Sequence, residues 1–256
     1  MRLARAIPVL LSVAANLAPG TAGAQYKQPW AGEGILARQT RFSIRVENIS
    51  AGEALKLSNG GSSPFVSAPV LWVVHTGTAN PIFTGGKRDA GEGLELLAET
   101  GDPSALVKVL PARAGIVAAG GVARAVGATA DGPITPGQAY EFQISAQSGQ
   151  LLSTAWMFGQ SNDLFYSNDR PIALFDASGA PLSGDLTTRL SLWDAGTEVN
   201  EEPGLGPNQG PRQASPDAGT TESQVIAHVR DKYTYPPTGQ VLRVTIRAIE
   251  DGMSVR

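Results

Sequence analysis

Residues 151–200 read LLSTAWMFGQSNDLFYSNDRPIALFDASGAPLSGDLTTRLSLWDAGTEVN, and the remaining chain reads as a scaffold around them. The stretch holds two acidic turns, residues 161–163 (SND) and 194–198 (DAGTE). Each turn directly follows an apolar segment with the character of a β-strand. Loops at the ends of neighbouring strands can meet in space, and carboxylates are ligands that hard cations prefer. The stretch therefore predicts strands whose acidic loops meet at one site.

Apolar segments with the spacing of β-strands recur along the rest of the chain. Residues 41–49 (RFSIRVENI) and 241–249 (VLRVTIRAI) alternate apolar and polar side chains, which is typical of strands with one solvated face. Residues 70–75 (VLWVVH) are continuously apolar and predict a central strand that is covered on both faces. Further strands are expected at residues 140–146, 151–158, 172–175 and 187–193.

Helix is favoured in one region, residues 90–110, where Pro103 suits the first turn of a helix. Residues 113–129 are rich in Ala and Gly and permit no firm assignment. Residues 200–224 are poor in large apolar side chains and predict a long loop, of a length that is usually functional or disordered. The whole pattern predicts an all-β protein, an antiparallel β-sandwich with a short helical excursion.

The composition excludes several kinds of site. The chain of 256 residues has no cysteine, which rules out disulfides, thiolate metal sites and cysteine nucleophiles. Its formal net charge of −3 argues against nucleic acid, which needs a basic face, and no basic cluster suits anionic lipid. No run of residues approaches the length of a transmembrane helix. We therefore expect no nucleic-acid partner and no transmembrane segment.

The first 24 residues have the three parts of a secretory signal: a basic start, an apolar core at residues 7–17, and small residues at 22–24 (AGA). The apolar core is too short to span a membrane. We expect a signal peptide at residues 1–24, a lead-in segment at residues 25–40, and one β-sandwich domain at residues 41–256. Such a protein would be secreted or periplasmic.

Five motifs follow one another along the chain: FSIRVENIS (42–50), PVLWVVH (69–75), GLELLAETGD (93–102), the Asn-Asp turn (162–163) and WDAGTEVN (193–200). In this order they resemble the spondin N-terminal domain, which occurs in F-spondin, mindin and many exported bacterial proteins. The resemblance covers residues 42–230. It implies an antiparallel β-sandwich, similar to the calcium-dependent membrane-binding modules of signalling enzymes, and a Ca²⁺ site. Carried over by position, the metal ligands are Asp163, Asp194 and Glu198. Glu198 departs from the aspartate that animal members tend to have, and its side chain is longer by one C–C bond.

The residue types are themselves consistent with calcium. Ca²⁺ takes about six to eight oxygen ligands, whereas zinc and copper favour His or Cys, and the only histidines are His75 and His228. Gly196 allows the backbone to curl between Asp194 and Glu198. The same acids also fit a structural role as caps of Asx-turns. Residues 217–222 (DAGTTE) echo the 194–198 motif, and we treat that echo as chance.

Three functions remain open at this point. We expect an exported, calcium-binding module that is not an enzyme and that serves adhesion or recognition of a protein or a surface glycan. One alternative is a glycosidase-like hydrolase that uses Asp163 and Asp194 as its carboxylate pair. Another is a structural envelope protein without a ligand. We expect His75 to be structural, because no Gly-x-Ser-x-Gly motif supplies a nucleophile for it.

The signal pattern predicts a mature protein that begins at Gln25. Intact-mass spectrometry of the exported protein should give the mass of the chain from Gln25 onward. An exported form that retains Met1 would contradict this prediction.

Overall fold

The computed structural model describes residues 39–216 and 218–249, so the expected signal peptide and nearly all of the lead-in segment lie outside it. The two alternating segments pair with each other: β1 (Thr40–Asn48) runs antiparallel to β13 (Leu242–Ile249). Ile44 lies opposite Ile246 in this pairing, because the apolar positions of both strands fall on the same face. β6 (Ala139–Ala146) extends the sheet beyond β1, and β10 (Gly184–Asp185) extends it beyond β13.

A second sheet faces the first and has seven strands. Its central strands are β4 (Val70–His75), β7 (Leu151–Met157), β8 (Leu164–Asn168) and β11 (Leu190–Asp194). The others are β5 (Ile116–Val122), β12 (Ala227–His228) and β9 (Ile172–Ala173), and β9 pairs with β7. A separate two-stranded ribbon joins β2 (Leu55–Lys56) and β3 (Ser62–Ser63). Every strand pairing is antiparallel, so the predicted antiparallel β-sandwich is confirmed.

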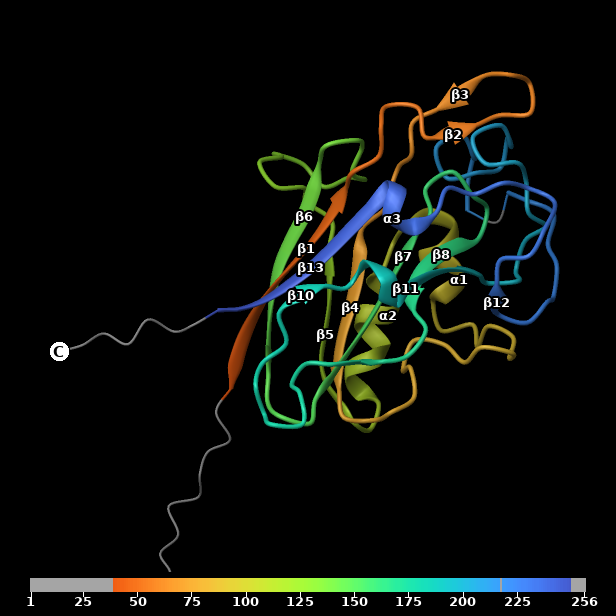
Figure 1. Ribbon diagram of the computed structural model, residues 1–256. Helices are drawn as coiled ribbons and strands as arrows, with labels where there is room; N and C mark the ends of the chain where they lie inside the picture. The colour runs from red at the N-terminus through yellow and green to blue at the C-terminus, as the bar shows by residue number, and fades with distance from the viewer. Residues whose placement is uncertain (1–38, 217, 250–256) are drawn as a thin grey trace, which may run out of the picture. The chain divides into compact units, whose positions relative to one another are not determined.

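The helical excursion forms a third layer (Figure 1). α1 (Leu94–Thr100) packs over β7 and β8, and α2 (Ser104–Val109) packs over β5 before a 3₁₀ turn at Leu110–Ala112. The sheet of seven strands is therefore covered on both faces, as the continuous apolar run of β4 predicts. Two further single turns, Thr187–Arg189 and α3 (Thr238–Val241), lie close to β13.

Two apolar cores result from this layering. The larger core fills the space between the sheets and contains the fully buried aromatic residues Phe65, Trp156 and Tyr166. The smaller core lies between the second sheet and the helices, where Leu71 and Val73 of β4 meet the side chains of α1 and α2. Alternate residues of β4 thus enter different cores, because successive side chains of a strand point to opposite faces.

Three strands of the second sheet are absent from the sequence-based expectation: the two-residue β12 and the longer β5 and β8. β5 lies in the Ala- and Gly-rich segment, where Gly120 lies beneath the ring of Trp72, and a Cβ there would approach Trp72 Cζ2 to 2.5 Å. β8 has polar residues in a strand that is buried throughout, and Asn168 Oδ1 accepts a hydrogen bond from Thr154 N–H at 2.8 Å. In the two longer strands, residues distant in sequence stabilise an extended conformation that the local sequence does not predict.

The described part of the long loop is held by its own polar side chains. Glu201 accepts hydrogen bonds from the backbone and the side chain of Asn208, and Glu202 accepts two from Ser58. Gln209 is completely buried and accepts a hydrogen bond from Gly204 N–H at 2.8 Å. Polar side chains therefore stabilise a segment that lacks a large apolar core of its own.

The fit of Trp72 over Gly120 can be tested by adding one methyl group. Gly120→Ala should lower the free energy of unfolding by about 1–3 kcal/mol, because the new Cβ overlaps a ring that is stacked on Phe142. Urea unfolding measures this change. Gly52→Ala is the matched control, because no atom lies within 4 Å of its Cβ position. Equal stability of the two variants would contradict the prediction.

Candidate metal centre

The pairing of β8 with β11 brings the two acidic turns together. Leu164 at the start of β8 lies opposite Asp194 at the end of β11, because the strands are antiparallel. The residue before β8 therefore lies beside the residues that follow β11. The Ala195 N–H donates to the backbone carbonyl of Asp163 at 3.2 Å. The two loops thus meet at one end of the second sheet, although 30 residues separate them.

Asp163 is the most buried acid of this site, with none of its surface exposed. Its Oδ2 accepts three hydrogen bonds, from Thr197 N–H at 2.8 Å, the Thr197 hydroxyl at 3.1 Å and Glu198 N–H at 3.0 Å. Its Oδ1 is buried and has no hydrogen-bond donor within the described chain. Burial, together with the charge of Asp194, raises the pKa of Asp163 to about 7 despite the three donors.

Asp194 is half-buried and holds the neighbouring turn. Its Oδ1 accepts a hydrogen bond from Gly196 N–H at 2.7 Å, and its Oδ2 accepts one from the Asn200 amide at 2.6 Å. Gly196 has φ of 71°, and a Cβ there would lie 2.9 Å from the backbone carbon of Gln224. Glycine is thus required at this turn both for its conformation and for the close approach. Burial raises the pKa of Asp194, and the negative charge of Asp231 raises it further.

Glu198 is buried, but its carboxylate is engaged elsewhere. Oε1 accepts a hydrogen bond from Gly219 N–H at 2.9 Å, and Oε2 accepts one from the Asn162 amide at 3.3 Å. Among the described residues, no group of three or more His, Asp or Glu side chains is arranged to hold a metal ion. The structure therefore brings the turns of Asp163, Asp194 and Glu198 together. The carboxylate of Glu198 is hydrogen-bonded to other residues of the protein.

The segment that echoes the motif lies directly beside it. Val199 N–H donates to Thr220 O at 2.8 Å, and Glu222 N–H donates to Thr197 O at 2.7 Å. Glu198 and Thr221 form an antiparallel bridge, so the two similar segments are in contact although the sequence provided no reason to expect it. Asp217, the first residue of the echo, lies outside the described residues.

Two acids near Asp194 are not among the expected ligands. Burial raises the pKa of Glu222, and the charge of Asp194 raises it further. Asp231 is exposed and accepts a hydrogen bond from the Tyr235 hydroxyl at 2.6 Å. The echo was a sequence signal for Glu222, whereas nothing in the sequence indicated Asp231. The site thus concentrates more negative charge than its three expected residues supply.

His75 lies at the end of β4 and is buried. Its Nε2 lies 2.9 Å from the hydroxyl of Ser153, which is also buried. Burial lowers the pKa of His75, and a hydrogen bond to the Gly77 backbone only partly offsets this effect. These contacts suit the structural histidine that the sequence predicts.

No protein-family model matches this chain, and no curated protein does. The likeness to the spondin N-terminal domain therefore rests on the motifs themselves. In the part of the chain that the structure describes, no helix is both long enough and apolar enough to cross a membrane.

The raised pKa of Asp163 predicts a pH dependence of the metal-free protein. A carboxyl group with a pKa of about 7 in the folded state and 3.8 in the unfolded state binds its proton more tightly when folded. Its contribution to stability is therefore fully present below about pH 4 and is lost as pH rises to 7. Urea unfolding from pH 4 to pH 8 in calcium-free buffer measures the trend.

Asp163→Asn provides the comparison, because the amide keeps the shape and cannot ionise. The wild type should lose stability relative to this variant as pH rises. Acids that do not interact with Asp163 titrate alike in both proteins, so the difference reports Asp163 and its coupling to Asp194. Parallel pH profiles would show that Asp163 does not titrate in this range.

Proposed function

We propose that the protein is an exported, calcium-binding β-sandwich module of the spondin N-terminal type, with a role in adhesion or recognition. Its partner would be a protein or a surface glycan. Asp163, Asp194 and Glu198 would hold the ion. Bound calcium would neutralise the acids and fix the loops that carry them, and the protein would act by binding without catalysing a reaction.

One observation carries the proposal: the completely buried carboxylate of Asp163 has an oxygen to which none of the described residues donates, and it lies within the field of Asp194. A buried carboxylate in this situation is stabilised by a proton or by a cation. Calcium suits the available atoms, because its ligands are carboxylate and carbonyl oxygens. The charges of Glu222 and Asp231 further favour a cation near Asp194.

For Glu198 to bind the ion, its carboxylate must give up its present hydrogen bonds. Its carboxylate accepts hydrogen bonds from Gly219 and Asn162, so metal binding by this side chain would replace them. Its backbone N–H already donates to Asp163, which keeps the residue next to the site. Asp163 and Asp194 are therefore the stronger members of the proposed ligand set.

A binding role also agrees better than hydrolysis with the burial of these acids. A glycosidase needs two carboxyl groups that flank the scissile bond. Asp163 has no exposed surface, and its Oδ2 is engaged by Thr197 and Glu198. An acid in this position is suited to an ion within the loops.

Calcium should raise the melting temperature of the protein. At a hundredfold excess over Kd, a ligand that binds only the folded state adds about 2.7 kcal/mol, which corresponds to roughly 5–10 °C for a domain of this size. Magnesium should raise the temperature less, because it resists dehydration and favours a strict octahedron. Thermal melting across a titration of each ion in calcium-free buffer measures both effects.

Asp194→Asn keeps the shape of the side chain and removes one charge, so it should weaken the calcium-dependent shift. Asp131→Asn is the matched control, because Asp131 is exposed and pairs with Arg124 at 2.9 Å. If the wild type and Asp194→Asn respond to calcium alike, Asp194 is not a ligand of a calcium site. A wild type that melts identically with and without calcium would favour the purely structural alternative.

A further inference from the structure

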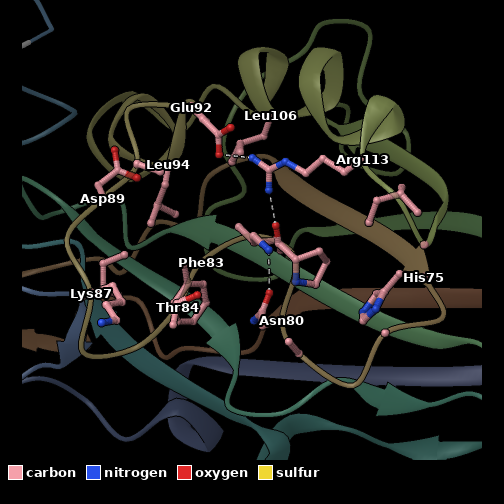
Figure 2. Close-up of a pocket in the computed structure, with 18 of the residues that line it drawn as sticks. His75, Asn80, Phe83, Thr84, Lys87, Asp89, Glu92, Leu94, Leu106 and Arg113 are labelled. Carbon is pink, nitrogen blue, oxygen red and sulfur yellow. Dashed lines mark hydrogen bonds and ion pairs between the residues drawn. The ribbon is translucent and has the colours of Figure 1, made fainter.

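A separate cavity of about 470 Å³ opens beneath the loop of residues 76–92, between that loop and the helical layer (Figure 2). This volume is within the range of about 300–1,000 Å³ that small-molecule sites occupy. Its residues include neither the two acidic turns nor any of the expected metal ligands. The cavity is therefore distinct from the candidate metal centre.

The inner wall of the cavity is apolar. Ile82, Leu94, Leu106 and Ile226 contribute side chains that are almost completely buried. His75 also lies on this wall, and burial lowers its pKa, which favours the neutral form of the ring. A ligand that reaches this wall would present apolar groups to it.

Arg113 lies at the cavity and is held from two sides. One terminal nitrogen donates to the carbonyl of Pro81 at 2.6 Å, and the other pairs with Glu92 (Figure 2). A guanidinium has five N–H donors in a rigid, planar arrangement. Donors therefore remain on a group whose position is already fixed, and a carboxylate can accept two of them side by side.

The other charged groups of the cavity favour an anion. Lys87 and Arg88 lie on the exposed rim, and within the described chain no carboxylate is in ion-pair contact with either. Glu92 pairs with Arg113, and Asp89 accepts a hydrogen bond from Gly91 N–H at 3.2 Å, which does not neutralise its charge. The three basic side chains outnumber these two acids, so the lining carries a net positive charge.

We propose that this cavity binds a small molecule with an apolar body and one carboxylate group. The body would lie against Leu94, Leu106 and Ile226, and the carboxylate would meet Arg113, while Lys87 and Arg88 on the rim would add positive charge at the cavity. This site goes beyond the proposed calcium-dependent function and does not depend on it.

The test uses phenylacetate and its neutral analogue phenylacetamide, which have similar shapes and differ in charge. Each is titrated into the full chain in calcium-free buffer, and amide chemical shifts are followed by NMR. Phenylacetate should bind with a Kd of about 1 mM or below. The neutral amide should bind at least about tenfold more weakly, because it lacks the charge that the basic side chains recognise. The shift changes should concentrate around Phe83 and Ile226.

Two variants test the basic groups. Arg113→Gln should weaken phenylacetate binding about tenfold. The double variant Lys87→Gln/Arg88→Gln should weaken it severalfold and leaves the bonds of Arg113 intact. Lys108→Gln is the control for charge, because Lys108 is exposed on α2 and does not line the cavity. It should bind as the wild type does.

Three results would overturn the proposal. The first is equal affinity for phenylacetate and phenylacetamide. The second is wild-type affinity in both the Arg113 variant and the double variant. The third is absence of phenylacetate-induced shift changes at about 10 mM, a concentration about tenfold above the highest expected Kd. The buffer holds no calcium, so none of these results bears on the proposed metal centre.

Discussion

The antiparallel register of β8 and β11 is the constraint on which the acidic site depends. It places Leu164 opposite Asp194, so that the residues before one strand lie beside those after the other. The hydrogen bonds of Asp163 to Thr197 and Glu198 then join the loops across this end of the sheet. A shift of one residue would turn each side chain of β8 to the opposite face. It would also separate the carboxylate of Asp163 from these backbone donors.

Two opposing influences set the pKa of Asp163. The donors at Oδ2 favour the ionised form of Asp163, whereas its burial and the charge of Asp194 disfavour that form. The balance keeps the carboxyl group near the point where it exchanges a proton at neutral pH. A site in that condition is responsive to any cation that reaches it, which is the physical basis of the proposed calcium function.

One segment links the candidate metal centre to the cavity. Gln224 N–H donates to Gly196 O at 2.9 Å, and two residues later Ile226 N–H donates to Lys87 O at 2.8 Å. Gly86 N–H donates to Ile226 O at 2.8 Å, and Trp193 of β11 packs against Gly85. The same short piece of chain thus contacts the acidic loops and the loop over the cavity. The two sites have separate ligand groups but share part of their support.

The sequence alone determined those strands and helices in which the spacing of apolar side chains shows which face is buried. The alternation of β1 and β13, the continuous apolar run of β4 and the helical region all follow from side chains a few residues apart. The positions of the acidic turns also follow, because residues 161–163 come shortly after β7 and Asp194 ends β11. Local periodicity carries this information, since it shows which faces a segment must bury.

The tertiary structure alone decided the features that depend on distant partners. β5 extends where it pairs with β4 and lies beneath Trp72 at Gly120, and the echo segment lies beside the motif, where Glu198 and Thr221 form a bridge. The orientation of the Glu198 carboxylate toward Gly219, the burial of the Asp163 carboxylate and the approach of Asp231 to Asp194 have the same origin. Hydrogen bonds and charges act through space, and a sequence specifies residue types without giving the distances between them.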